Sequence, residues 1–332
     1  MLSRVADAVY WMNRYVERAE NVARIVDVNL HLQLDLPTSA AEQWAPILAV
    51  ADVEAPYTAK YGPIANHEDA REKVLHFLTF DEDNPNSILA CVRLARENAR
   101  SVREIISSEM WEQANTFYLM VREAASAGRL AEPHEFFTAV KQASHLFVGI
   151  SYLTMTHNEA WQFGRVGRLL ERADATSRIL DVKTLLHLPD LTDIGSPTDE
   201  VQWTAILKSA SAFEMYRKAH GRIRPKQVAA FLMLDRKFPR AMKYCIVKAE
   251  RSLHAITGRP VGSYDSVAEQ RLGRLRMEFE SIDMAEIATR GLHEYLDACQ
   301  GQLNRVGDAM VDTFFALKPA AVRPHDARAQ AR

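Results

Sequence analysis

The chain has 332 residues, 48% of them hydrophobic, and a net charge of −2 at neutral pH. This composition supports a sizeable core, and the lack of net basicity argues against broad nucleic-acid binding. No apolar run approaches the ~20 residues that cross a bilayer, and the first residues lack the apolar core of a signal peptide. Three widely spaced cysteines fit no disulfide framework. We therefore expect a cytoplasmic protein without a membrane or nucleic-acid partner.

The abundance of Ala, Leu, Arg and Glu predicts an all-α fold, which begins with one long helix. Apolar residues recur along it at the spacing of a core-facing helix surface: Val5, Val9, Met12, Val16, Ala19, Ala23, Val26 and Leu30. The other side mixes apolar residues such as Tyr10 and Ile25 with a polar group: Arg14, Glu17, Arg18 and Asn21. A helix that is apolar on two sides is usually buried on two sides, so we expect these charges to lie in a seam within the fold.

Part of this helix recurs 154 residues later. RYVERAENVARIVDV at 14–28 matches RLLERADATSRILDV at 168–182 at eight of fifteen positions, where composition predicts roughly one match. The matches include three charged pairs: Arg14 and Arg168, Glu17 and Glu171, Arg18 and Arg172. Because charged residues are rarely buried without partners, this repeated Arg–Glu–Arg group is the strongest indication of a site.

The same order of matches extends along the chain, at 74–95 against 228–249 and at 43–48 against 202–207. We therefore predict a tandem duplication. The predicted organisation is one helical domain with two pseudo-repeats and a disordered basic tail: domain 1–317, repeats 1–152 and 153–317, tail 318–332.

Local signals place the remaining elements in each half. Proline-bearing breaks at Leu36–Pro37 and His187–Pro189 end the long helices. Pro85 and Pro239 each suit the first position of a later helix. A capping pair at Asp283–Glu286 is expected to open the last long helix, which runs toward Phe315.

Three interpretations of the repeated charges remain open. A solvent-exposed ladder contributes only ~0.2–0.5 kcal/mol per ion pair. A buried network, in which each Glu bridges Arg side chains between helices, would be structural. An anionic ligand such as a carboxylate or phosphate would instead complete the excess of two Arg per Glu. If the two long helices meet at a pseudo-twofold axis, both groups form one anion site, which is predicted to comprise Arg14, Arg18, Asn21, Arg168, Arg172 and Asp174.

Three further residues are secondary candidates. Glu159 precedes a helix, and Asp235 and Arg240 flank a proline turn. Helix or turn capping is the simpler explanation of each. The alternative for Glu159 is an acid–base pair or a metal ligand, and for Asp235 and Arg240 it is a contribution to the Arg-rich seam.

Metal and cofactor sites are not expected. Asp27 and His31 have the i, i+4 spacing of a metal-binding edge, but the second segment has Leu185 where His31 stands. The chain has no Gly-rich phosphate loop and no dinucleotide fingerprint.

The segments quoted above resemble a known family. YWMNRYVERAEN at 10–21 is similar to the opening of the bacterial alpha-E family, a helical domain called after its Glu–Arg motif. WQFGRVGRLLERAD at 161–174 resembles its second signature, and two later segments also match: 231–240 and 291–296. The resemblance covers essentially residues 1–317. Asn13 departs from it, because a small, glycine-like residue is expected there.

This resemblance implies a part in peptide ligation or processing. Members resemble components of gene clusters that encode a circularly permuted ATP-grasp amide ligase, a transglutaminase-like cysteine protease and sometimes a proteasome-related peptidase. We expect an accessory protein that works with the ligase and whose Arg-rich site holds a carboxylate-bearing peptide. The alternatives are an enzyme with Glu17 or Glu171 as general acid–base, and an interaction scaffold with a purely structural Glu–Arg network.

Overall fold

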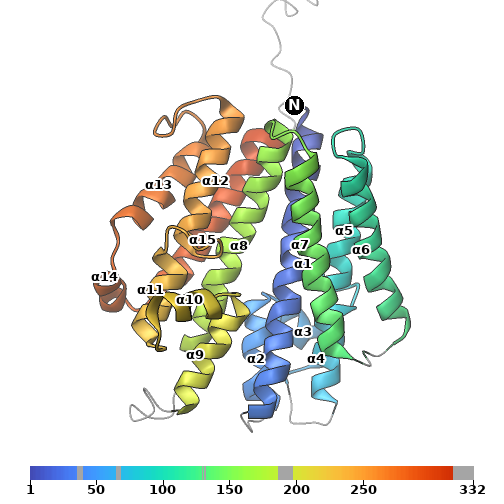
Figure 1. The fold of residues 1–332 in the computed structure, drawn as a ribbon, viewed down its shortest axis with the longest axis vertical. Coiled ribbons are helices and arrows are strands. Elements are labelled where there is room, and N and C mark those ends of the chain that lie inside the picture. Colours follow the sequence, from blue (N-terminus) through green and yellow to red (C-terminus); the bar gives the residue numbers. More distant parts are fainter. Residues whose placement is uncertain (36–39, 65–68, 129, 131, 186–196, 317–332) are drawn as a thin grey trace, which may run out of the picture.

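The computed structural model describes residues 1–332 except 36–39, 65–68, 129, 131, 186–196 and 317–332. The described residues form helices and no strand, which confirms the all-α prediction. Two groups of helices lie side by side, and the two longest helices run through the middle of the molecule (Figure 1).

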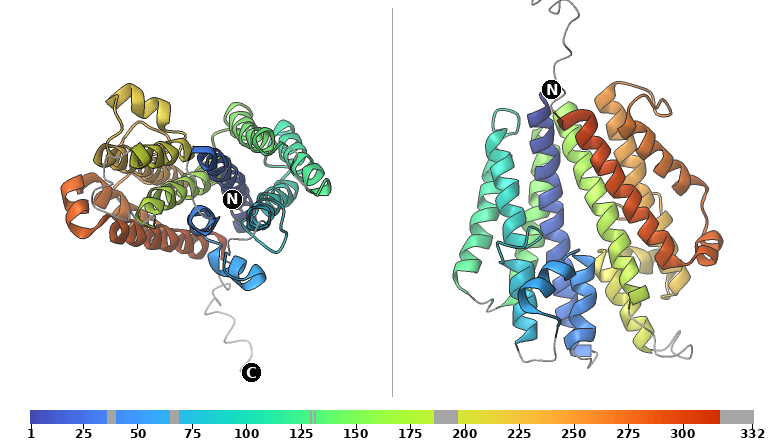
Figure 2. Two further views of the ribbon diagram at one scale, coloured as in Figure 1. Left: turned by 90° about the horizontal axis from the view of Figure 1, so that it is seen from below. Right: turned by 180° about the vertical axis from the view of Figure 1, so that it is seen from behind.

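Four long helices form a bundle on each side. The first bundle consists of α1 Ser3–Asp35, α5 Ile88–Ser101, α6 Ser108–Ser126 and α7 Pro133–Thr154. The second consists of α8 Glu159–Leu185, α12 Met242–Thr257, α13 Val267–Ser281 and α15 Leu292–Met310. In each bundle the first helix packs against the second and the fourth, and the third packs against both of these. Because α1 and α8 also pack against each other, they form the junction between the bundles (Figure 2).

Shorter helices connect the first and second long helices of each bundle and lie at one end of the molecule (Figure 1). They are α2 Ala40–Val50, α3 Glu54–Tyr61, α4 Ala70–Thr79, α9 Pro197–Ser209, α10 Phe213–His220 and α11 Pro225–Leu234. Among the helices of the described residues, none is both long enough and apolar enough to cross a membrane.

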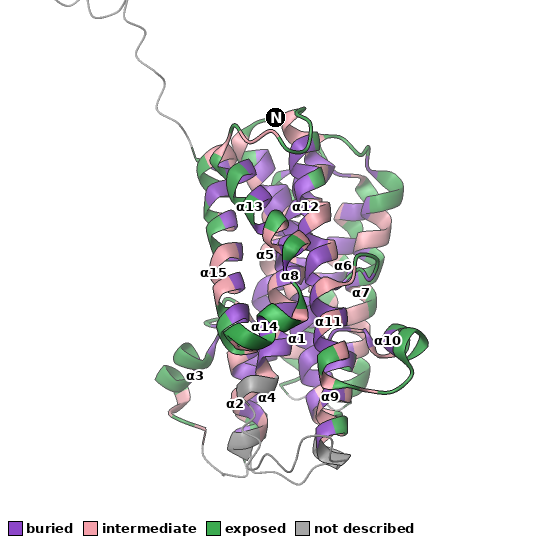
Figure 3. Cartoon of the chain, turned by 90° about the vertical axis from the view of Figure 1, so that its left-hand side faces the viewer, coloured by how far each residue is buried: buried purple, intermediate pink, exposed green. Residues whose placement is uncertain are grey.

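The first helix is buried on two sides, as its pattern predicted. Seven of the eight residues of its apolar stripe are buried, and Leu30 is partly buried. Tyr10 and Ile25 on the opposite side are buried as well. Buried residues follow the inward faces of the long helices throughout (Figure 3). Charged residues in the middle of α1, Glu17, Glu20 and Arg24, are therefore enclosed between α1 and its neighbours.

The two prolines expected at helix starts lie elsewhere, so that prediction was wrong. α5 and α12 each begin three residues after Pro85 and Pro239, because the chain makes a further turn, and Ser87 supplies the N-cap of α5. The proline carbonyl oxygens instead accept weak hydrogen bonds from the thiols of Cys91, at 3.7 Å, and Cys245, at 3.3 Å.

The last long helix is interrupted where the sequence predicted continuity. Asp283 does cap a helix, accepting from the backbone N–H of Glu286 at 2.9 Å. This helix is only α14 Met284–Arg290, and it ends at Gly291, whose φ of +92° favours glycine. A short π-helical turn, Val311–Phe315, follows α15. The predicted proline breaks and the predicted tail lie outside the described residues.

Candidate functional site

Two glycines of α8 allow its close approach to α1. A Cβ atom at Gly167 would lie 2.5 Å from the backbone oxygen of Tyr10, and one at Gly164 would lie 2.5 Å from Nδ2 of Asn13. Both separations are too short for a carbon contact. A larger residue at Gly167 would push the helices apart, whereas one at Gly164 would displace the Asn13 side chain. Gly164 thus accommodates Asn13, the residue that departs from the expected family pattern.

The Glu171 carboxylate of α8 binds two arginines of α1. Arg14 donates from Nε to Oε2 at 2.8 Å, and Arg18 donates from Nε to Oε1 at 2.6 Å and from Nη2 to Oε2 at 3.1 Å. Arg14 also donates to the hydroxyl of Tyr10, and Arg18 to Oδ1 of Asn86. Burial raises the pKa of Glu171, but the charges and hydrogen bonds of Arg18 and Arg14 outweigh burial and hold it at about 2.

The Glu17 carboxylate of α1 is bound in the opposite direction, by the second bundle. Arg172 of α8 donates from Nε to Oε1 and from Nη2 to Oε2, both at 2.7 Å. Arg240, in the turn before α12, lies 3.2 Å from Oε1 of the same carboxylate. All of these contacts, like those of Glu171, cross between the bundles, so both repeated groups lie at the junction of α1 and α8, and together we call them the network.

Glu20 lies one turn further along α1 and extends the network toward α7. It pairs with Arg24 of its own helix and with Arg240. Its other contacts come from α7, where Ser144 donates to it at 3.0 Å and Nε2 of His145 lies 3.1 Å away. Burial raises the pKa of Glu20, but Arg240 and the other partners outweigh burial and hold it well below its ordinary value.

Arg168 is the exception among these arginines. It matches Arg14 in the sequence repeat, yet no acceptor among the described residues binds its guanidinium. It remains within electrostatic range of Glu17 and Glu20. Burial, and then the positive charge of Arg172, lower the pKa of Arg168 to about 10.

The position of Arg240 explains why Arg168 has no carboxylate partner among the described residues. At the matching position the first half has Asn86, which is uncharged, so Glu171 remains available to two arginines of α1. In the second half Arg240 is the second arginine, besides Arg172, that pairs with Glu17. Four guanidinium groups gather on this side: Arg24, Arg168, Arg172 and Arg240. They share two carboxylates, those of Glu17 and Glu20, so two positive charges are uncompensated among the described residues.

A pocket of about 470 Å³ opens beside this side of the network. It is lined by Glu20, His145, Val148, Gly149, Tyr152, Leu153 and Arg172. Tyr152 and Leu153 of α7 are 61% and 81% exposed, whereas Glu20 is buried. The pocket therefore has an apolar outer wall and a charged inner wall.

Two other predicted residues lie in or beside the network. Oδ1 of Asn21 accepts a hydrogen bond from Arg240 at 2.9 Å. Asp174 pairs with Arg178 of its own helix at 2.8 Å, and burial raises the pKa of Asp174. Its Oδ1 atom is buried without a hydrogen-bond partner among the described residues.

Two secondary candidates lie away from the network and have simpler roles. Glu159 accepts from the amino group of Met1 at 3.0 Å, at the exposed start of α8. Asp235 accepts from the backbone N–H groups of Lys237 and Phe238, each at 2.7 Å, and so caps the turn before α12. Of the three secondary candidates, only Arg240 contributes to the seam.

The arginines around Glu171 and Glu20 hold these two carboxylates as anions. A general acid–base at neutral pH needs a pKa near 7, whereas the pKa values of Glu171 and Glu20 are displaced away from neutrality. Bidentate arginine contacts also occupy both oxygens of Glu17. The arrangement suits charge recognition better than proton transfer.

Sequence reasoning missed the contributions of Glu20, Ser144 and His145. The sequence could have indicated Glu20, because the second segment has another acidic residue, Asp174, at the matching position. Nothing in the sequence indicated that Ser144 and His145 contact Glu20. They reach Glu20 from α7 across 124 and 125 residues of chain, and only the packing of α7 on α1 brings them together.

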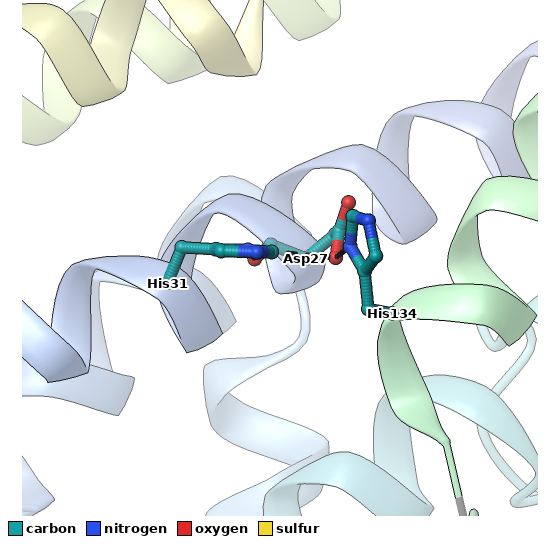
Figure 4. A group of neighbouring side chains, drawn as sticks. All are labelled: Asp27, His31 and His134. Atoms are coloured by element: carbon teal, nitrogen blue, oxygen red, sulfur yellow. Dashed lines mark hydrogen bonds and ion pairs between the residues drawn. The ribbon is translucent and has the colours of Figure 1, made fainter.

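A second polar group lies further along the α1–α7 interface (Figure 4). Nδ1 of His134, from α7, lies 2.8 Å from Oδ1 of Asp27, and Nδ1 of His31 lies 3.7 Å from the same atom. Lys141 donates to the other oxygen of Asp27 at 2.7 Å. The sequence had indicated Asp27 and His31 only, because His134 lies 107 residues from Asp27.

Comparisons with known proteins agree with the resemblance noted in the sequence. A model of the alpha-E family, described as a predicted alpha-helical domain with a conserved ER motif, matches residues 1–315. Uncharacterised proteins of Mycobacterium bovis and of Mycobacterium tuberculosis strain H37Rv are 25% and 24% identical to this chain over 97% of its length. The chain spans only 38% of the length of these relatives. No solved structure matches. With the family model spanning both bundles and both Glu–Arg pairs, the chain belongs to the alpha-E family.

Proposed function

We propose that the chain is a binding protein that holds the carboxylate of a ligand at Arg168, one helical turn before Arg172, which lines the pocket between α1, α7 and α8. The observation that carries this proposal is the partly buried guanidinium of Arg168, which has no acceptor among the described residues. An uncompensated buried charge costs several kcal/mol, and a bound anion removes that cost. A carboxylate fits the guanidinium fork and supplies one of the two missing negative charges.

The pocket wall supports a ligand that is apolar next to its carboxylate. Tyr152 and Leu153 are exposed on this wall, and Leu146, on the same helix, is 53% exposed. Exposed apolar side chains that adjoin a charged pocket are typical of binding surfaces. The C-terminal residue of a peptide with an apolar side chain has this combination of groups.

We extend the proposal to the partners that the family resemblance implies. A circularly permuted ATP-grasp amide ligase is the first, and a transglutaminase-like protease is the second. A ligase that joins peptides through a carboxylate needs this group held in place, which an anion pocket on a helical accessory protein provides. The three buried free thiols, Cys91, Cys245 and Cys299, support a reducing, cytoplasmic location.

A tandem duplication is the proposed origin of the two bundles. Matching contacts support it: Asp27 with His134 and Asp181 with His293 both approach to 2.8 Å. The helices of the two bundles also pack in the same order. On this proposal, one half gained a ligand site when Arg240 replaced an uncharged residue.

The binding proposal is tested with a dileucine peptide that has a free C-terminal carboxylate and with its C-terminal amide, by isothermal titration calorimetry. We expect the acid to bind and the amide to bind at least tenfold more weakly, because the amide lacks the charge that Arg168 pairs with. Arg168→Met should lose the preference for the acid. Arg165→Met removes a neighbouring arginine that stacks on Trp161 and should retain the preference. Equal binding of acid and amide, or a preference that survives Arg168→Met, would contradict the proposal.

The partner proposal needs a separate test. Co-expression of the chain with a circularly permuted ATP-grasp ligase, the partner that the resemblance implies, followed by size-exclusion chromatography, should give a joint peak. Separate elution at micromolar concentrations would refute the partnership and leave the binding proposal to the peptide experiment.

A further inference from the structure

We propose that Asp27, His31 and His134 bind a divalent transition-metal ion, with Zn²⁺ as the representative. The three side chains come from two helices, α1 and α7, and point toward one another (Figure 4). Their ligand atoms all lie within 4.8 Å of one another. This site is independent of the anion pocket, since it shares none of the residues that line it.

The spacing of the ligand atoms is close to what a tetrahedral ion requires. With Zn–N and Zn–O distances of ~2.0–2.2 Å, two ligands of one ion lie about 3.3 Å apart. Oδ1 of Asp27 lies 2.8 Å from Nδ1 of His134 and 3.7 Å from Nδ1 of His31. Nδ1 of His31 also donates to the backbone oxygen of Asp27 at 2.8 Å, so this imidazole must give up that hydrogen bond to bind an ion. The imidazoles are 62% and 54% exposed, so small side-chain rotations can complete the geometry without moving a helix.

The ligand types select the class of metal. Two imidazoles and one carboxylate suit Zn²⁺, Fe²⁺ or Co²⁺, whereas Mg²⁺ and Ca²⁺ prefer oxygen ligands alone. Three protein ligands leave a fourth position open to water or to an incoming group. The exposure of both imidazoles gives an ion access from solvent.

Lys141 sets a limit on how Asp27 can bind an ion. Its ammonium donates to Oδ2 at 2.7 Å, so only Oδ1 is free to act as a monodentate ligand. Hydrogen bonds to the second oxygen commonly orient metal-binding carboxylates. The positive charge of Lys141 nevertheless repels a cation, so it lowers the affinity of the site.

The second bundle provides an internal comparison. Asp181 and His293 repeat the contact between Asp27 and His134, with the same 2.8 Å separation. This shared pair is explained as a structural tie between the first and last long helix of each bundle. Leu185 stands where the first bundle has His31. His31 is therefore the residue that supplies a third metal ligand in addition to the Asp–His pair that both bundles share.

The experiment is Zn²⁺ titration of the full chain, free of any affinity tag, by isothermal titration calorimetry. We expect one ion per chain. His31→Leu reproduces the second bundle and should weaken binding roughly a hundredfold or more, since even changes outside the ligand set typically cost 10–100-fold. His134→Gln should do the same from the other helix. Lys141→Gln should tighten binding several-fold, because it removes the repelling charge.

His293→Gln is the matched control, because it alters the equivalent pair of the second bundle and should leave Zn²⁺ affinity unchanged. Thermal unfolding gives a second readout. Excess Zn²⁺ should raise the melting temperature of the wild type and of His293→Gln, but not that of His31→Leu. Absence of binding to the wild type overturns the proposal, as does affinity that both His31→Leu and His134→Gln retain while folded.

Discussion

Arg14 and Arg168 occupy matching positions in the two Glu–Arg segments, but in the part of the chain that the structure describes only Arg14 has a carboxylate partner. Nε of Arg14 lies 2.8 Å from Glu171, whereas Arg168 is excluded from Glu17 by Arg172 and Arg240. Both arginines at Glu171 are therefore paired, whereas on the Glu17 side Arg168 has no carboxylate contact among the described residues. This difference between two similar halves locates the proposed ligand site on one side.

Removing the charge of Arg168 should stabilise the free protein. Its pKa, lowered to about 10 by burial and by Arg172, shows that the folded state disfavours the charged form. Arg168→Met keeps most of the aliphatic stem and should raise the free energy of unfolding by about 1–3 kcal/mol. Urea denaturation at pH 7 measures this. A loss of stability would mean that an acceptor does bind Arg168.

Removing the charge of Glu17 should have the opposite effect. Glu17→Gln leaves Arg172 and Arg240 without their shared carboxylate in a buried seam, and we expect a loss of about 3–5 kcal/mol. Glu159→Gln is the control, because its ion pair with the amino group of Met1 is exposed and should contribute less than about 1 kcal/mol. Similar losses in both variants would argue against a buried network.

Acid should destabilise the fold at a pH set by Glu171. Its pKa is about 2 in the folded state against an ordinary value of 4.5, so the carboxylate stabilises the fold above pH 4.5. That contribution, of about 3 kcal/mol, should be lost as the pH falls from about 4.5 to 2. Urea midpoints measured across this range should fall steeply in the wild type. Glu171→Gln, already less stable at pH 7, should show a shallower fall.

The close approach of α1 and α8 should depend on Gly167. Gly167→Ala places a methyl group against the backbone oxygen of Tyr10, which cannot move aside as a side chain could. We expect a loss of about 1–3 kcal/mol, and the shifted helices should weaken the Arg–Glu contacts as well. Gly149→Ala is the matched control on α7. Nothing lies within 4 Å of its added carbon, so it should be neutral or up to about 1 kcal/mol stabilising.

Much of the architecture could be predicted from periodicity alone. The apolar stripe of α1 and the apolar residues opposite it, such as Tyr10, implied a helix that is buried all round, which the central position of α1 confirms. The failures were local. Helix periodicity continues through Arg290 and Leu292, so it gave no sign of the break that the left-handed backbone of Gly291 introduces.

The sequence indicated many of the charged residues of the candidate site, but not which of them form ion pairs with each other. The sequence repeat indicated charged residues that the structure brings together where α1 meets α8, because the same charges recur in both segments. Which arginine lacks a partner depends on Arg240, a residue from a turn whose approach to Glu17 follows only from the packing of α8 on α12. The exchange of Asn86 for Arg240 was visible in the alignment of the two halves, and its meaning required the geometry.

The crossed direction of the Arg–Glu pairs has a consequence for how the molecule holds together. Among the described residues, the arginines that form ion pairs with Glu17 belong to the second bundle, and those that form ion pairs with Glu171 belong to the first. Either bundle alone would therefore lack the arginines with which its own glutamate, Glu17 or Glu171, forms ion pairs. In this respect the molecule behaves as an obligate heterodimer whose two subunits share one polypeptide, with residues 155–158 as the tether that keeps them at high local concentration.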